Sequence, residues 1–104
     1  MIPNLDYIDE IAENDIVFKN KLISIIKNEF PIEKDEFLKN ITENNFLLAS
    51  QNVHKLKHKI NMLGLKKGSE IAIKFENELL KKNNNLKEEF IEVIKLIENY
   101  LNKI

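Results

Sequence analysis

The sequence predicts an all-α protein, an antiparallel up-down bundle of four helices with a short accessory helix at the N-terminus. Apolar residues recur at helical spacing along nearly the whole chain, and no stretch alternates like a half-buried strand. Only two glycines and two prolines occur, so few positions interrupt a helix. The 104 residues show no linker or internal repeat, so we expect a single domain covering residues 1–104.

Composition excludes several classes of protein. The chain has no cysteine, which rules out a disulfide framework and a thiolate metal site. The first ten residues lack the basic and apolar regions of a secretory signal, and no apolar run approaches the ~20 residues of a membrane span. A net charge of -1 does not favour a nucleic-acid partner. We therefore expect a soluble cytoplasmic protein that binds neither membrane nor nucleic acid.

The chain should open with a short helix. Asn4 is placed to cap it, and the helix should run to about Ala12. Leu5, Ile8 and Ile11 recur at helical spacing and should face inward. A helix this short is expected to lie across one end of the bundle.

A longer helix should follow, capped by Asn14 or Asp15 and ending near Phe30. Pro31 has no amide hydrogen to donate, so we expect the first bundle helix to be broken there and to restart toward Thr42. The residues of both parts expected to face the core are Phe18, Leu22, Ile25, Ile26, Phe37, Leu38 and Ile41.

The central helix is predicted from Phe46 to about Leu63. Asn44 or Asn45 should cap its start, and Gly64 can adopt the left-handed conformation that closes a helix. Two stripes run along it, rotated roughly 120–140° from each other at 100° per residue. The apolar stripe, expected to face the core, comprises Val53, Leu56, Ile60 and Leu63. The polar stripe, expected to face solvent, comprises His54, Lys57, His58 and Asn61.

Two further helices complete the predicted bundle. The first should start near Lys66 or Ser69 and end near Lys82. Three asparagines at 83–85 form a turn, after which the last helix should run to about Lys103. Their core residues should be Ile71, Ala72, Phe75, Leu79, Phe90, Ile94, Ile97 and Leu101.

Charge is distributed unevenly around the outward-facing histidine. No acidic residue lies between Glu43 and Glu70, although five lysines do. The histidine therefore lies in a locally positive field. From the helix pattern alone, His54 is an exposed histidine within a basic patch.

The run His54-Lys55-Leu56-Lys57, with Gly64 ten residues after the histidine, resembles the signature of histidine-containing phosphotransfer (HPt) domains. That family carries His-x-Leu-Lys-Gly followed by a Leu/Ile-Gly pair. The segment 15–31 also resembles the first long helix of the family, and the chain length fits. The resemblance implies that His54 accepts a phosphoryl group from the aspartyl phosphate of one receiver domain and passes it to the aspartate of another.

The resemblance also implies roles for other residues. Glu76, 22 residues after His54, would accept the Nδ1 hydrogen and orient the ring, leaving Nε2 to react. Lys57 would pair with the phosphoryl oxygens. The surface meeting the partner would include Lys55, His58, Lys59 and Asn61. An alternative for Glu76 is a surface ion pair with Lys74 or Lys81.

The implied protein is a carrier without kinase activity of its own. Its partners would be response-regulator receiver domains and a hybrid histidine kinase, and we expect it to be a monomer. It would need no cofactor, since Mg²⁺ belongs to the receiver.

His58 departs from the family pattern, which has glycine at this position. Its ring could swing aside, form a hydrogen bond to the phosphoryl group, or obstruct transfer. In the last case the chain would be a phosphorylation-incompetent bundle that docks on receiver or kinase domains.

The sequence favours two other interpretations less. His54 and His58 at i and i+4 could supply half of a metal site, but neighbouring lysines repel a cation. The lysines could form a nucleic-acid face, but no exposed aromatics are interleaved with them.

Overall fold

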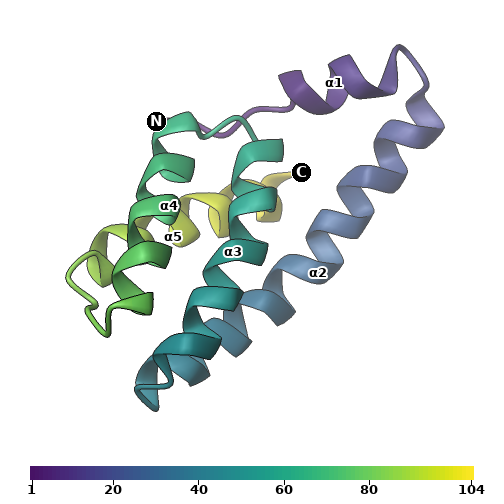
Figure 1. Cartoon of the computed structure of the whole chain (residues 1–104). Helices are drawn as coiled ribbons and strands as arrows, with labels where there is room; N and C mark the ends of the chain where they lie inside the picture. Colours follow the sequence, from purple (N-terminus) through teal and green to yellow (C-terminus); the bar gives the residue numbers. More distant parts are fainter.

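The computed structural model describes all 104 residues and consists of five α-helices without a strand (Figure 1). The helices are α1 (Asp6–Ala12), α2 (Ile16–Thr42), α3 (Phe46–Met62), α4 (Lys66–Leu80) and α5 (Lys87–Lys103). None of them combines the length and the apolar character that crossing a bilayer would require. The predicted all-α class and the short N-terminal helix are confirmed.

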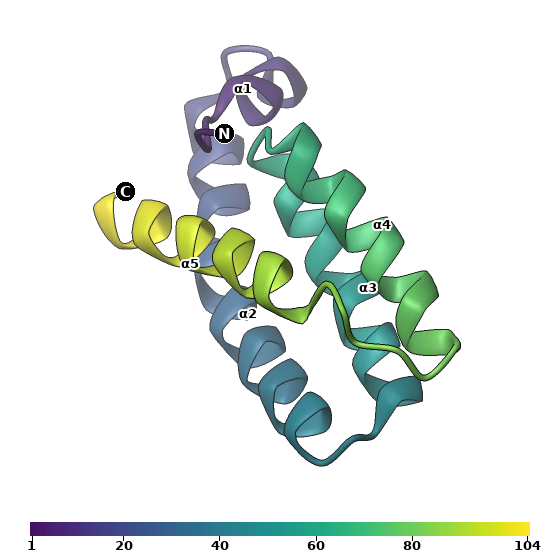
Figure 2. The ribbon, with the colours of Figure 1, turned by 90° about the vertical axis from the view of Figure 1, so that its left-hand side faces the viewer.

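Helix α3 lies at the centre of the arrangement and packs against both α2 and α4. These three helices alternate in direction, and α5 then runs across them, as both ribbon views show (Figures 1 and 2). Helix α1 spans one end of the bundle, next to the start of α2. A helical bundle is therefore confirmed, whereas a regular up-down arrangement of four helices is not.

A single cluster of buried apolar side chains fills the interior, with members from all five helices. The predicted inward stripe of α3 is confirmed, because all four of its residues are fully buried. At the centre, Phe37 of α2 meets Phe75 of α4 and Phe90 of α5 with ring centroids 6.0 and 5.2 Å apart. Both pairs are edge-to-face, a favourable geometry for aromatic rings. All five helices thus contribute to one core around α3.

The predicted break at Pro31 is wrong. Helix α2 continues through this proline from Ile16 to Thr42. A proline inside a helix costs about 3 kcal/mol, because it removes one hydrogen bond and crowds the preceding turn. Phe30 and Phe37 on either side of it are fully buried, and each buried aromatic side chain contributes about 1.5–3 kcal/mol. Tertiary packing on both sides of the proline therefore holds the helix together.

Several apolar residues predicted to face the core are instead exposed. Phe18 and Ile25 lie in the first half of α2, which diverges from α3 toward α1 (Figure 1). Ile11 of α1 and Leu38 of α2 are also exposed. Helical spacing alone indicated one apolar face, but these side chains have no helix packed over them.

Asn4 and Gly64 join the N-terminal segment to the end of α3. The Asn4 amide donates to the carbonyl oxygen of Leu63 at 2.8 Å, and its side-chain oxygen accepts from the amide of Asp6 at 3.0 Å. Gly64 has a φ of +77°, as predicted for the residue that closes the helix. A Cβ atom on Gly64 would lie 2.6 Å from the Asn4 side chain, so any other residue would displace that side chain and strain the backbone.

Gly68 brings α4 close to its neighbours. A Cβ atom at this position would lie 3.0 Å from Cγ1 of Val93 and 3.1 Å from Cγ2 of Ile60. The missing side chain therefore allows α4 to approach both α3 and α5 closely. This close approach positions the outward face of α4 beside the outward face of α3.

Candidate functional site

His54 lies in the middle of α3 and points away from the core. Val53 before it and Leu56 two residues after it are both fully buried and belong to the apolar stripe on the other side of the helix. The imidazole side chain is 51% exposed. The helix is held on its opposite face by the core, so the ring is presented to solvent from a fixed backbone. The predicted outward orientation of His54 is confirmed.

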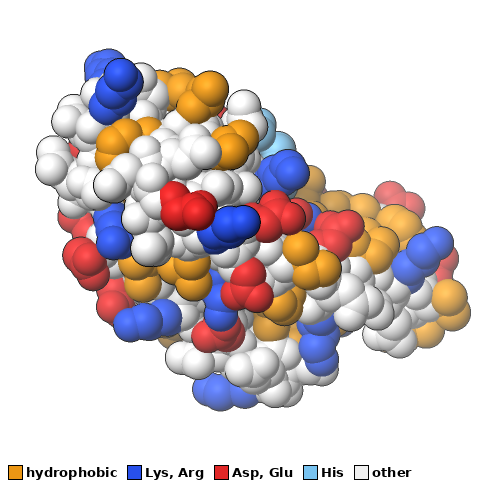
Figure 3. Space-filling model, turned by 90° about the horizontal axis from the view of Figure 1, so that it is seen from below, with side chains coloured by type: hydrophobic (Ala, Val, Ile, Leu, Met, Phe, Trp, Pro, Cys, Tyr) orange, Lys and Arg blue, Asp and Glu red, His pale blue; other side chains and the backbone are white.

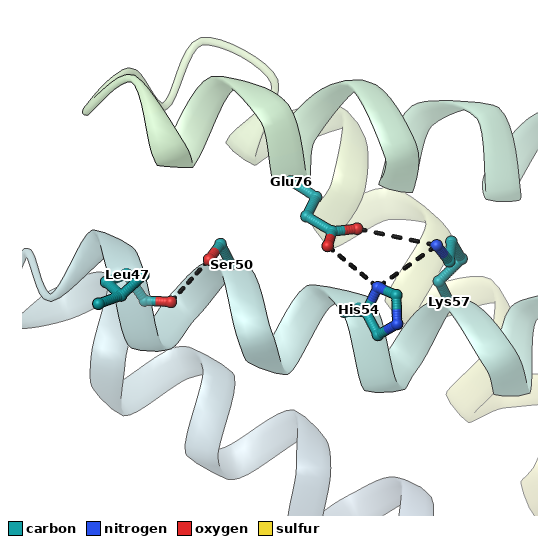
Figure 4. A network of polar contacts seen from close by, with 5 residues as sticks. All are labelled: Leu47, Ser50, His54, Lys57 and Glu76. Atoms are coloured by element: carbon teal, nitrogen blue, oxygen red, sulfur yellow. Dashed lines mark hydrogen bonds and ion pairs between the residues drawn. The ribbon is translucent and has the colours of Figure 1, made fainter.

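Glu76 reaches His54 from α4. Its Oε1 lies 3.0 Å from His54 Nδ1 (Figure 4). Since a carboxylate only accepts hydrogen bonds, the hydrogen of the neutral ring belongs on Nδ1. The other nitrogen, Nε2, lies on the side of the ring away from Glu76 and keeps its lone pair (Figure 4). The contact therefore selects one tautomer and leaves one nitrogen free to act as a nucleophile.

Lys57 completes a cluster of three side chains. Its Nζ lies 3.8 Å from Glu76 Oε2 and 3.4 Å from His54 Nδ1. An ammonium group has no lone pair, and an Nδ1 that carries hydrogen cannot accept from it. The carboxylate is therefore the partner of the ammonium group. Glu76 forms a hydrogen bond with His54 and an ion pair with Lys57, and it pairs with neither Lys74 nor Lys81, the two alternatives considered from the sequence.

His58 lies one turn after His54 on the same helix and is exposed. The two ring centroids are 5.1 Å apart and the rings are almost perpendicular, at 89°. The side chain therefore stands directly beside the candidate nucleophile.

The other residues proposed for the partner surface do not all lie together. Lys59 faces α2, where its Nζ lies 2.8 Å from Glu29 and 3.3 Å from Glu33, and its side chain is only 13% exposed. Burial lowers the pKa of Lys59, but hydrogen bonds and charge attraction to the two carboxylates outweigh it, so the pKa is raised above 10.5. The charge of Lys59 is thus paired with these two carboxylates and does not add to the positive charge beside His54. Asn61 is exposed and accepts a hydrogen bond from the Ser69 hydroxyl, which links α3 to α4.

A surface hollow of about 510 Å³ adjoins His54 between α3 and α4. Its lining residues are Leu47, Ser50, Gln51, His54, Lys55, Glu76 and Leu80. Leu47 and Leu80 are 61% and 57% exposed, and the Ser50 hydroxyl donates to the Leu47 carbonyl at 2.6 Å (Figure 4). The space-filling view likewise shows histidine side chains at the surface near lysine and hydrophobic side chains (Figure 3).

The sequence pattern did not lead us to predict that Leu47 and Leu80 border this hollow. A signal was present, because Leu47-Leu48 and Leu79-Leu80 each place two leucines in succession on a helix. Successive residues are 100° apart, so both members of such a pair rarely face the core. In the second pair Leu79 is buried and Leu80 is exposed, as this geometry requires.

The arrangement suits a reaction at one exposed nitrogen. It combines an imidazole of fixed tautomer, a carboxylate able to stabilise positive charge on that ring, and an adjacent ammonium group. The structure contains no group of three or more histidine, cysteine or acidic side chains that could hold a metal ion. Comparison of this chain with models of known protein families, with curated proteins and with solved structures finds no match.

Proposed function

We propose that this chain is a phosphorelay carrier of the HPt type. His54 accepts a phosphoryl group from the aspartyl phosphate of a receiver domain and passes it to the aspartate of another. The observation that carries the proposal is the contact between His54 and Glu76, which come from different helices and meet at 3.0 Å. The sequence around His54 resembles the HPt signature, and in that family a residue on the following helix orients the histidine that is phosphorylated. The proposal includes the antiparallel four-helix arrangement typical of that family.

The chemistry requires only one nucleophilic nitrogen on this chain. The lone pair of His54 Nε2 attacks phosphorus, the bond from phosphorus to the aspartyl oxygen breaks, and that oxygen leaves as carboxylate. Nδ1 keeps its hydrogen throughout, so the phosphorylated ring carries a positive charge. Glu76 stabilises this charge through its hydrogen bond to Nδ1. Transfer to the next receiver is the reverse of the same step.

The surroundings of His54 support docking of another protein. Leu47 and Leu80 offer exposed apolar area beside the nucleophile, and Lys55 adds positive charge at the edge of the same hollow. Such a surface suits a receiver domain, whose phosphorylation site is acidic and binds Mg²⁺. The relay would operate in the cytoplasm, and this chain would act in it as a monomer without kinase activity.

The proposal is tested by incubating the purified chain with phosphorylated receiver domains from its own genome. We expect a phosphoryl group to appear on the chain that is labile in acid and stable in alkali, as a phosphorus-nitrogen bond is. Mass spectrometry of peptides kept at alkaline pH should locate it at His54. If receivers bind but none of them transfers a phosphoryl group, the chain is a docking module and the proposal fails.

Replacing Glu76 with alanine should slow phosphoryl transfer to His54 by about 10- to 100-fold, the loss seen when a metal-binding histidine loses the carboxylate that orients it. The ring would lose both its fixed tautomer and the neighbouring negative charge. Rapid-quench measurements with a phosphorylated receiver would give the rate, and ring ¹⁵N chemical shifts would report the tautomer. The exposed Glu70, also on α4, provides a control that removes the same charge. Equal rates for both variants would show that Glu76 does not act on His54.

A further inference from the structure

A phosphoryl group on His54 Nε2 would need hydrogen-bond donors on that side of the ring. The group carries a charge of about -2 and three strong acceptor oxygens. Lys57 is the expected donor, but its ammonium group lies on the Nδ1 side, 3.4 Å from Nδ1 and 3.8 Å from Glu76 Oε2 (Figure 4). Its side chain is only 17% exposed. Glu76 therefore holds Lys57 away from the position where the phosphoryl oxygens would lie.

Lys59 cannot supply the missing donor. Its ammonium group is bound to Glu29 and Glu33 of α2 and is largely buried. Bringing it to His54 would break both ion pairs and leave Glu33, whose side chain is only 16% exposed, without its partner, which is costly for a largely buried carboxylate. Neither Lys57 nor Lys59 is therefore positioned to donate to a phosphoryl group on Nε2.

His58 is placed to be that donor. Its ring is exposed and perpendicular to the His54 ring, with centroids 5.1 Å apart. A phosphoryl group on Nε2 extends outward from the His54 ring by a P–N and a P–O bond. Its oxygens can therefore come within hydrogen-bonding distance of the His58 ring, although the two imidazoles form no hydrogen bond with each other. An exposed imidazole can also rotate about its side-chain bonds to meet the group without disturbing the core.

We propose that His58 is a phosphoryl ligand, donating a hydrogen bond from its imidazole N–H to a phosphoryl oxygen carried by His54. This inference rests on the proposed function. It assigns a use to the one residue at which the sequence departs from the HPt pattern. A glycine at this position would offer no side-chain donor, whereas the imidazole offers one N–H to the phosphoryl group. The ring then stabilises the phosphorylated state of this chain relative to that of the receiver.

The test compares wild type, His58→Ala and His58→Gln, each equilibrated with one receiver domain and its phosphoryl donor. His58→Ala should lower the equilibrium constant for transfer onto His54 by about 3- to 10-fold, the effect of losing one hydrogen bond of ordinary strength at a solvent-exposed site. His58→Gln keeps an N–H donor and should remain within about twofold of wild type. Because the side chain is exposed, all three proteins should melt at nearly the same temperature.

A second measurement reports the contact directly. The wild-type chain is phosphorylated with phosphoramidate, a small donor that needs no receiver, and the ring ¹⁵N signals of His58 are recorded before and after. A shift of these signals on phosphorylation of His54 supports the hydrogen bond. Unchanged signals overturn the inference, and so does an equilibrium constant in His58→Ala equal to or above that of wild type.

The carrier function and the role of His58 are refuted by different results. If wild type is phosphorylated at His54 and His58→Ala behaves identically, only the role of His58 is refuted and the carrier function stands. If wild type accepts no phosphoryl group from phosphoramidate or from any receiver, the carrier function fails and the inference fails with it. A label that persists in His54→Gln and disappears in His58→Gln would make His58 the acceptor and overturn both.

Discussion

Replacing His54 with glutamine should abolish phosphorylation of this chain. The glutamine amide has no lone pair that can attack phosphorus, so the loss should be complete. The substitution should change the free energy of unfolding by no more than about 0.5 kcal/mol, because the side chain is half exposed. The amide can still donate to Glu76, which keeps that carboxylate partnered. Phosphoryl transfer assays and thermal melting followed by circular dichroism would check both expectations.

The second histidine provides the control for this result. The chain has only two histidines, so His58→Gln leaves His54 as the single possible phosphohistidine. His58→Gln should still be phosphorylated, whereas His54→Gln should not. Labelling that survives in His54→Gln would contradict the assignment of the acceptor. Receiver binding that is unchanged in His54→Gln, together with an unlabelled wild type, would favour the docking alternative.

Replacing Phe37 with alanine should destabilise the fold by about 3–5 kcal/mol, through lost burial and the cavity left behind. Phe37 is fully buried and joins α2 to both α4 and α5 through Phe75 and Phe90. A domain of this size has a total stability of about 5–15 kcal/mol, so the variant should lose a large share of it. Urea denaturation of variant and wild type would measure the difference.

The neighbouring residue supplies a matched control. Leu38 lies on the same helix but is 38% exposed, although its spacing in the sequence predicted burial. Leu38→Ala should therefore cost much less than Phe37→Ala, about 1 kcal/mol or less. Equal losses in the two variants would contradict the observed orientation of α2. The pair tests which face of this helix is covered.

The central helix shows what local pattern can predict. Its apolar stripe, its outward histidine and the closing role of Gly64 all follow from a repeat of 3.6 residues and from the conformational freedom of glycine. These properties depend on residues close together in the sequence. The observed burial of Val53 and exposure of His54 agree with the pattern. Local pattern therefore predicted an exposed histidine, whereas its role as a nucleophile follows only from the resemblance to HPt domains.

Helix α2 shows where local pattern fails. Pro31 predicted a break, because the local cost of a proline in a helix is large. The buried aromatics on both sides of it reverse the outcome, and their contribution depends on helices distant in the sequence. The exposure of Phe18 and Ile25 has a related cause, since periodicity defines a face but not whether another helix covers it.

The sequence by itself determined the all-α class, the position of the helices and the outward orientation of His54, because each follows from interactions within a few turns of one helix. Only the tertiary structure decided which charged groups meet. It brings Glu76 to Nδ1 of His54, ties Lys57 to that carboxylate and turns Lys59 toward α2. Side chains of opposite charge pair across helices according to how closely the helices pack. For α3 and α4 that distance depends on Gly68, whose missing side chain lets the two helices approach.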